Sequence, residues 1–180
     1  MKLKEITKSK ETVYDGSVIT VERHIATLEN GKDAVRDVVR HPGGVGVVAM
    51  DDEGFIYMVR QFRYPFYETT LEIPAGKLDK GGEDTKSAGI RELREETGLV
   101  ADNIEYLGTF YATPGFCDEK LAIYFATGLH QGETCPDEDE FIECEKYKLS
   151  ELIEMIDRGE IKDAKSVIGI LMVNNKVNNL

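Results

Sequence analysis

The feature that most constrains this chain is the segment from Arg91 to Leu99, in which three glutamates occur within five positions just before a glycine. A helix turns about 100° per residue, so Glu96 and Glu95 fall about 40° and about 60° to either side of Glu92. The three carboxylates then project from one side of a helix, where they repel one another. Mg²⁺ prefers oxygen ligands and would relieve that repulsion. A solvated acidic face is the alternative.

The residues upstream favour the metal-binding interpretation. Gly76 is the end of a strand and turn that begin at Glu72. It lies fifteen residues before Arg91, and Glu83 lies eight residues before Arg91. This spacing resembles the Nudix box, in which a Gly and a Glu precede Arg-Glu-aliphatic-any-Glu-Glu-any-Gly-aliphatic. In one departure, six residues rather than five separate Gly76 from Glu83. The extra residue lies in a Gly-rich loop, where insertions are tolerated, and Glu83 faces away from Glu92, which predicts a structural role.

The rest of the predicted helix suits packing on a sheet. Its expected core face consists of Ile90, Leu93 and Thr97. Gly98 is suited to the left-handed residue that ends a helix, and Arg91 lies one turn from Glu95, within reach of a charge-assisted hydrogen bond. Gly89 indicates either a close approach of backbone or ligand or simple tolerance, and the sequence leaves both open.

Composition excludes several classes of protein. A chain of 180 residues can form one domain with a sizeable core, and its net charge of −12 argues against a nucleic-acid partner. A phosphate-bearing substrate would then require metal ions and local arginines. We find no apolar run long enough to span a membrane and no signal-peptide core. Three cysteines without a CxxC pair favour free thiols in the cytoplasm.

Alternating and β-branched segments separated by turns predict a mixed α/β (α+β) domain with antiparallel strands at the N-terminus. Asn30-Gly31 is a strong hairpin signal. Strands are expected at 17–28, 34–40, 45–50, 55–61, 104–112, 120–129 and 141–149. Ser150 is expected to cap a helix that runs through Asp157 and buries Leu152, Ile153 and Ile156. Asp163 is expected to cap a last helix, whose core positions are Val167, Ile168, Ile170 and Leu171.

Beyond the box, the chain resembles the ADP-ribose pyrophosphatase subfamily of Nudix hydrolases. Pro114 lies sixteen residues after Gly98, as the subfamily's proline does, and the segments 38–43, 59–63 and 71–76 also match. The resemblance implies a Nudix-type α/β/α sandwich with mixed sheets, one domain over 1–180. It also implies a homodimer, in which residues from about 1 to 42 take part in dimerisation and 43–180 form the catalytic core.

The same resemblance suggests which residues contact substrate. These are Arg40, Arg63, Glu72, Pro114 and Phe116. A guanidinium binds phosphate bidentately, although each arginine could equally be a surface or strand-edge residue, and the proline an ordinary loop proline. One aromatic among Phe62, Tyr64, Phe66 and Tyr67 could stack on adenine, while core packing is expected for at least two of them.

The implied mechanism is metal-assisted hydrolysis of ADP-ribose to AMP and ribose 5-phosphate. By resemblance, Glu92, Glu95, Glu96 and the Ala75 carbonyl would hold Mg²⁺, with Mn²⁺ as the alternative. Glu138 is the candidate general base, and Glu140 and Glu119 are the other candidates. Two functional alternatives remain. One is the same chemistry on another nucleoside diphosphate sugar or a dinucleotide, and the other is a non-catalytic ADP-ribose sensor, a class that typically loses the box glutamates kept here.

Overall fold

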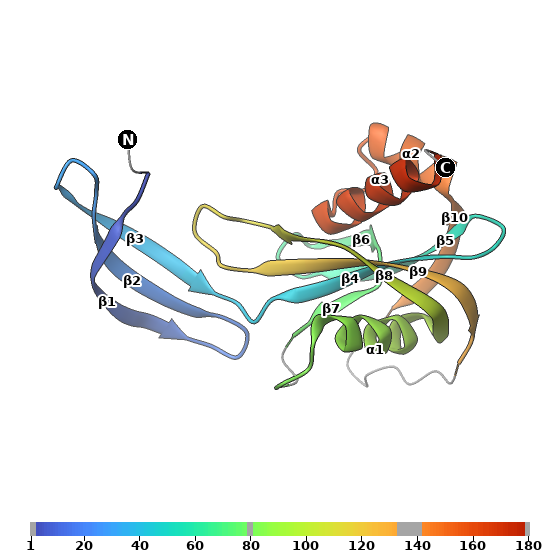
Figure 1. Ribbon diagram of the computed structural model, residues 1–180, viewed down its shortest axis with the longest axis horizontal. Helices are drawn as coiled ribbons and strands as arrows, with labels where there is room; N and C mark the ends of the chain where they lie inside the picture. Colours follow the sequence, from blue (N-terminus) through green and yellow to red (C-terminus); the bar gives the residue numbers. More distant parts are fainter. Residues whose placement is uncertain (1–2, 79–80, 133–141, 179–180) are drawn as a thin grey trace. The chain divides into compact units, whose positions relative to one another are not determined.

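The computed structural model describes residues 3–78, 81–132 and 142–178 (Figure 1). Its chain contacts divide into two compact units. The first, called the N-terminal unit, comprises Met1–Gly43 and Tyr111–Lys120, and the second, called the core unit, comprises Gly44–Phe110 and Leu121–Leu180.

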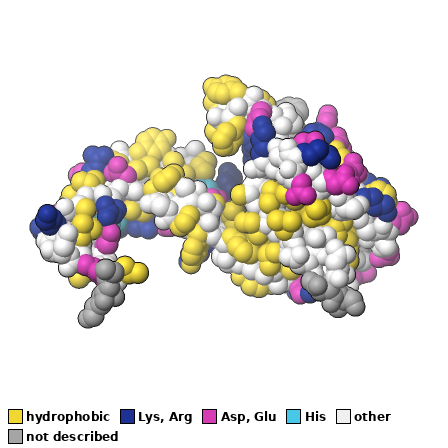
Figure 2. Space-filling view, turned by 90° about the horizontal axis from the view of Figure 1, so that it is seen from above, with side chains coloured by type: hydrophobic (Ala, Val, Ile, Leu, Met, Phe, Trp, Pro, Cys, Tyr) yellow, Lys and Arg dark blue, Asp and Glu magenta, His cyan; other side chains and the backbone are white. Residues whose placement is uncertain are grey.

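The N-terminal unit is a three-stranded antiparallel sheet in the order β1-β2-β3, formed by β1 (Ile6–Asp15), β2 (Thr20–Thr27) and β3 (Asp33–Arg40). The predicted hairpin closes at Gly31, whose φ of 79° suits glycine. Acidic and basic side chains lie close together on this unit (Figure 2), for example in the Lys8–Asp33 pair at 2.6 Å. Among its described side chains, only Ala26 and His24 are buried.

The core unit contains a seven-stranded mixed sheet in the order β10-β5-β4-β9-β8, with β6 paired to β5 and β7 to β4. Its strands are β4 (Gly44–Met50), β5 (Phe55–Arg63), β6 (Glu68–Glu72), β7 (Ala75–Lys77), β8 (Leu99–Tyr111), β9 (Lys120–Gln131) and β10 (Glu143–Lys148). Strands β4 and β9 pair in parallel, whereas β4 pairs with β5 and β7 antiparallel. The predicted mixed sheet is therefore confirmed.

Helices cover both faces of this sheet (Figure 1). They are α1 (Thr85–Thr97), α2 (Leu149–Asp157) and α3 (Ala164–Asn178). Because side chains of a strand alternate between faces, β4 supplies Val45 and Val47 to the core cluster under α1 and Val48 to the cluster under α2 and α3. The arrangement is the expected α/β/α sandwich.

Both α1 and α3 approach β4 at a glycine. A Cβ on Gly89 of α1 would lie 3.2 Å from the methyl groups of both Val45 and Val47, and a Cβ on Gly169 of α3 would lie 2.7 Å from Val48 Cγ2. Of the two interpretations of Gly89, a close approach is therefore the correct one: the α1 backbone lies against valine side chains of β4.

Three details of the helices differ from the sequence-based expectation. Ile90 is 43% exposed, because the close contact with β4 is made by Ala88, Gly89 and Leu93 instead. Leu171 is 39% exposed, although Ile170 is fully buried. Helix α2 begins at Leu149 with Lys148 at its N-cap rather than Ser150, since β10 leads directly into the helix.

The start of α3 agrees with expectation. The Asp163 carboxylate accepts a hydrogen bond from the Ser166 amide at 3.0 Å, which satisfies a backbone donor of the first turn. In α2, Leu152 is buried, and Ile153 and Ile156 pack against the same core cluster as predicted.

Candidate active site

The turn after β6 brings the chain backbone against the acidic side of α1. A Cβ on Gly76 would lie 1.9 Å from Oε1 of Glu92, so the carboxylate occupies the space that any other residue's side chain would need. One residue earlier, the Ala75 amide donates to Oε2 of Glu96 at 2.9 Å. Two of the three predicted carboxylates are thus placed against the Ala75-Gly76 backbone.

Arg91 connects the remaining acidic residues. Its Nη1 donates to Oε2 of Glu95 at 2.6 Å and lies 2.7 Å from Oε1 of Glu92, while Nη2 lies 3.0 Å from Oε2 of Glu83. Burial lowers the pKa of Arg91, but its hydrogen bonds to Glu83 and Glu95 and the charge of Glu92 outweigh burial and raise that pKa overall. The predicted Arg91–Glu95 bond is confirmed, and Glu83 reaches Arg91 despite the extra loop residue.

The donors gathered here are chemically suited to a hard divalent cation. Glu92, Glu95, Glu96 and the Ala75 carbonyl supply oxygen, and oxygen is what Mg²⁺ and Mn²⁺ take. Over residues 3–78, 81–132 and 142–178, no three Asp, Glu, His or Cys side chains are spaced as a ready metal cage. One nitrogen of Arg91 contacts both Glu92 and Glu95.

A second charged group lies where β5, β6 and α3 meet. Glu72 is only 2% exposed, and its two oxygens accept hydrogen bonds from Nε and Nη2 of Arg63 at 2.7 and 2.6 Å. Thr70 Oγ1 donates to it at 2.5 Å, and Lys165 also bonds to it. Burial raises the pKa of Glu72, but the Arg63 hydrogen bonds and the charge of Lys165 outweigh burial and lower that pKa to about 2.

Arg63 faces the same site as the acidic helix. Its hydrogen bonds to Glu72 raise the pKa of the guanidinium, burial opposes them, and the charges of Asp163 and Glu96 raise it further. Sequence reasoning named Arg63 and Glu72 but missed Lys165 and Thr70. No motif marks Lys165, because it comes from the first turn of α3, ninety-three positions along the chain from Glu72.

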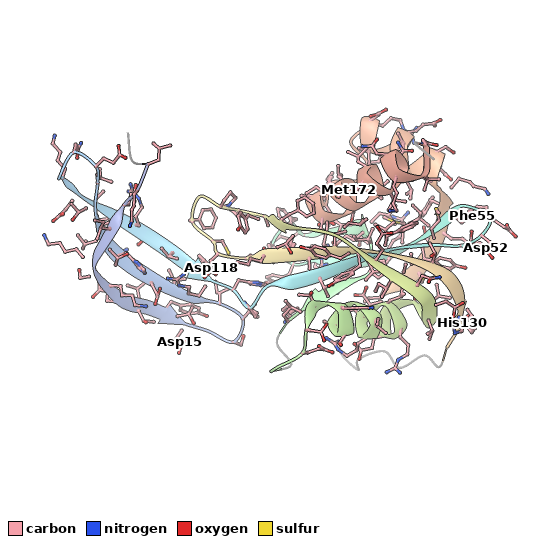
Figure 3. The ribbon with its side chains drawn as sticks, in the orientation of Figure 1. Asp15, Asp52, Phe55, Asp118, His130 and Met172 are labelled. Carbon is pink, nitrogen blue, oxygen red and sulfur yellow. The ribbon has the colours of Figure 1, made fainter. Side chains whose placement is uncertain are left out.

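In the N-terminal unit, Arg40 is held by two carboxylates. Its Nε donates to Glu22 at 2.8 Å and its Nη1 to Asp118 at 2.9 Å. Asp118 belongs to the loop that follows β8 and lies alongside β3 (Figure 3), where its amide donates to the Val39 carbonyl at 3.0 Å. Arg40 therefore ties this loop to β3, and its contact with substrate stays a prediction.

The other predicted substrate contacts lie on exposed segments. Pro114 and Phe116 belong to the loop that Arg40 ties down, and Phe116 is 56% exposed. The expectation of core packing for some of the β5–β6 aromatics is wrong, because all four are more than half exposed: Phe62, Tyr64, Phe66 and Tyr67. They lie at the end of β5 and in the turn between β5 and β6.

The candidate bases divide between described and undescribed segments. Glu138 and Glu140 lie outside the residues that the structure describes. Glu119 lies in the N-terminal unit, with its Oε1 3.5 Å from Nδ1 of His41.

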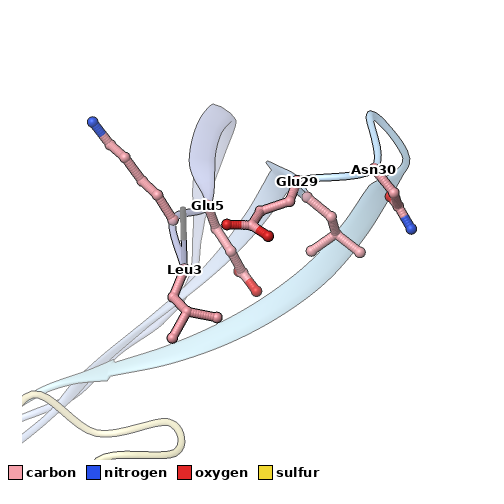
Figure 4. A pocket seen from close by; sticks show the side chains of 6 residues that line it. Leu3, Glu5, Glu29 and Asn30 are labelled. Carbon is pink, nitrogen blue, oxygen red and sulfur yellow. The ribbon is translucent and has the colours of Figure 1, made fainter. Parts of the chain in front are cut away.

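Three further observations concern the rest of the molecule. A hollow of about 500 Å³ in the N-terminal unit is lined by residues around Leu3 and the β2–β3 turn (Figure 4) and contains no predicted site residue. Cys117 and Cys144 are free thiols. Among the described residues, no helix has both the length and the apolar character needed to cross a membrane.

The sequence of this chain is similar to a protein family and to several known proteins. A family model described as the NUDIX domain matches residues 40–168. The chain is 42% identical to an ADP-ribose pyrophosphatase of Bacillus subtilis (strain 168), over 93% of this chain and 91% of the relative. It is 40% identical to a methanol dehydrogenase activator of Bacillus methanolicus, over 92% and 90% of the two chains.

A third relative and a solved structure agree. An ADP-ribose pyrophosphatase of Mycobacterium tuberculosis is 36% identical, over 93% of this chain and 82% of the relative. The crystal structure of an ADP compounds hydrolase superimposes with a TM-score of 0.86 over 98% of this chain and 95% of its own, at 22% identity. That structure shows the same fold.

Proposed function

The chain belongs to the NUDIX family, and from this premise we propose that it hydrolyses the diphosphate bond of ADP-ribose to give AMP and ribose 5-phosphate. The observation that carries the proposal is the placement of the Glu92 and Glu96 carboxylates against the Ala75-Gly76 backbone. Full-length similarity to ADP-ribose pyrophosphatases supports the substrate.

Hydrolases of this family generally depend on a divalent metal, and we propose Mg²⁺, with Mn²⁺ as the alternative. Glu92, Glu95, Glu96 and the Ala75 carbonyl would hold it. When bound, the ion would neutralise phosphate charge and lower the pKa of water. Arg91 would keep these carboxylates on one side of α1, as its hydrogen bond to Glu95 at 2.6 Å indicates.

The remaining residues would bind and orient the substrate. We propose that Arg63 contacts a phosphate oxygen and that Glu72, being buried, acts by holding Arg63. A positive group at this point offsets the net charge of −12, which otherwise repels a diphosphate. Arg40, Pro114 and Phe116 remain proposed contacts of the nucleoside part, and Glu138 remains the proposed base.

We further propose a homodimer located in the cytoplasm. All ten residues of β1 are exposed, and the described part of the N-terminal unit buries two side chains, which is too small a core to stabilise a sheet alone. A second copy is the partner that the family relationship favours. The free thiols of Cys117 and Cys144 suit a reducing compartment.

The direct test is release of AMP from ADP-ribose in the presence of Mg²⁺, with and without a chelator. We expect fast release that the chelator abolishes and that exceeds hydrolysis of ADP-glucose and NADH. Faster hydrolysis of another nucleoside diphosphate sugar or of a dinucleotide would make that compound the substrate in place of ADP-ribose. Binding of ADP-ribose without release would indicate a sensor.

A further inference from the structure

We infer that Lys165 is a positioning residue, which sets the orientation of Arg63 toward the substrate diphosphate by sharing the Glu72 carboxylate. This inference rests on the proposed function, because it assigns Arg63 to a phosphate of the substrate. Lys165 lies outside the Nudix box, on the opposite helix layer from the metal-binding glutamates.

The geometry around Glu72 leaves little freedom. A carboxylate has about four acceptor positions, and Glu72 receives four donors: two from Arg63, one from Thr70 and one from Lys165. The side chain of Glu72 is 3% exposed, so water contributes little to its solvation. Loss of any one donor therefore leaves a buried oxygen less well satisfied, and the remaining partners must move.

Lys165 is itself fixed in place. Its side chain is 11% exposed, and its Nζ also lies 3.0 Å from Oδ2 of Asp163. The aliphatic stem passes β4 at Gly46, where a Cβ would lie 3.8 Å from Lys165 Cδ. The ammonium group thus reaches Glu72 from α3 along one defined path, and it cannot turn into solvent without leaving two carboxylates.

The charges form an alternating series that ends at the active site. Asp163 pairs with Lys165, Lys165 with Glu72, and Glu72 with Arg63, whose side chain is 37% exposed. Glu72 takes the Nε–Nη2 edge of the guanidinium, so Nη1 is the end that Glu72 does not occupy and that we assign to a phosphate oxygen. Because Lys165 shares the negative charge of Glu72, Arg63 retains more of its own positive charge for that oxygen.

The test compares steady-state kinetics of K165M, K165Q and K165R with the wild type. We expect K165M to raise KM for ADP-ribose about tenfold with a smaller change in kcat, because it weakens the binding contact that Arg63 makes and removes no reacting group. K165Q keeps a hydrogen-bond donor without the charge and should raise KM less than K165M does. K165R keeps the charge, and its KM should lie within about threefold of the wild-type value. K162M is the matched control, since Lys162 lies in an exposed pair with Glu68 and should leave KM unchanged.

A double-mutant cycle with R63M separates positioning from direct contact. If Lys165 acts through Arg63, the double variant R63M/K165M has the KM of R63M alone. Additive increases would overturn the inference, and so would an unchanged KM in both K165M and K165Q, or a K165R variant no better than K165M.

Failure of the proposed function gives a different result. Wild-type protein that does not hydrolyse ADP-ribose would overturn that function alone. The same variants would then be compared on the nucleoside diphosphate that the wild type does hydrolyse, where the expected order of KM values is unchanged.

Discussion

Gly76 is the residue at which the backbone and the acidic side of α1 come closest. The Glu92 carboxylate lies over its Cα, at a distance that excludes a methyl group. The obstructing atoms are the end of a flexible side chain, so a larger residue displaces Glu92 rather than the backbone. Position 76 therefore controls the placement of a predicted metal ligand more than it controls stability.

Replacement of Gly76 by Ala should lower ADP-ribose hydrolysis by at least about tenfold, because Glu92 has to leave its position. The melting temperature should change by no more than about 3 °C. Gly81→Ala is the control, since a Cβ there meets nothing within 4 Å. Equal activity of Gly76→Ala and Gly81→Ala would show that Glu92 need not occupy this space.

Substitution of Gln for Glu92 or for Glu96 should lower turnover about a hundredfold or more, since each removes a charge that the proposed metal requires. The circular dichroism spectrum should not change. Glu154→Gln removes an exposed carboxylate on α2 and serves as the control. Near-normal turnover in both variants would rule out these residues as metal ligands.

Local spacing was enough to predict some of these residues but not others. The Arg91–Glu95 bond follows from their separation by one helical turn. Ile90 was wrongly placed in the core, because periodicity alone does not reveal that the helix presents its glycine to β4. Lys165 could not be predicted, since its partner Glu72 is adjacent only in the folded chain.

Among the elements, α1 is fixed at both ends. At its start the Asp84 carboxylate accepts from the amides of Lys86 and Ser87 at 2.9 and 3.1 Å. At its end Gly98 takes the left-handed conformation with φ of 72° and donates to the Arg94 carbonyl. These caps define where the helix begins and ends, and hence which residues face the turn at Gly76.

Removal of the first cap should weaken the helix. Asp84→Ala should lower the free energy of unfolding by about 1 kcal/mol, the usual cost of losing an N-cap carboxylate. Urea denaturation measures this change. The control is Asp52→Ala, in the exposed β4–β5 turn, which should alter stability by less than about 0.5 kcal/mol.

The contact between β6 and α3 should make stability depend on pH. The pKa of Glu72 falls from an ordinary value of 4.5 to about 2 in the folded chain, so its ion pairs stabilise the fold fully above pH 4.5. That contribution disappears as the pH falls through about 2. The wild type should exceed Glu72→Gln in unfolding free energy by about 3 kcal/mol at pH 7.

The difference between the two proteins should shrink steadily when the pH is lowered below about 4.5, in denaturant titrations at each pH. Glu154→Gln, which removes an exposed charge, should show no comparable trend. A difference that is constant from pH 7 to pH 3 would mean that Glu72 does not stabilise the fold as an ionised group.

Strands were predictable where runs of apolar or β-branched residues lie between turn signals. The segments 45–50 and 55–61 correspond to β4, which is a continuous apolar run buried on both faces, and to β5, with a turn between them. The extent of β1 was not predicted, because all of its residues are exposed and no apolar face marks it. Strand β7, at three residues, is too short to leave a periodic signal.

For the whole molecule, the two units differ in how they are stabilised. The core unit has two extensive apolar clusters, one on each face of its sheet. The N-terminal unit has cross-strand ion pairs such as Lys10–Glu22 in place of such a cluster. Ion pairs at a surface contribute little to the free energy of unfolding. Length and composition predicted one domain with a sizeable core, but they did not predict that nearly all of the buried side chains lie in the core unit.

This difference leads to a prediction about assembly. The full chain should sediment at twice its mass of 20.2 kDa at micromolar concentration, because a second copy would cover the exposed N-terminal sheet. Sedimentation velocity over a range of concentrations measures this. A species of 20.2 kDa throughout would count against the homodimer.

The two glycines that meet β4 have a consequence for how the enzyme can change over evolution. Gly89 and Gly169 bring α1 and α3 within van der Waals contact of opposite sides of the same strand. The spacing between the glutamates of α1 and Lys165 of α3 is therefore set by the thickness of β4 together with its valine side chains. Loops around the site are free to diverge, whereas a larger residue in place of either glycine would shift one helix layer relative to the other.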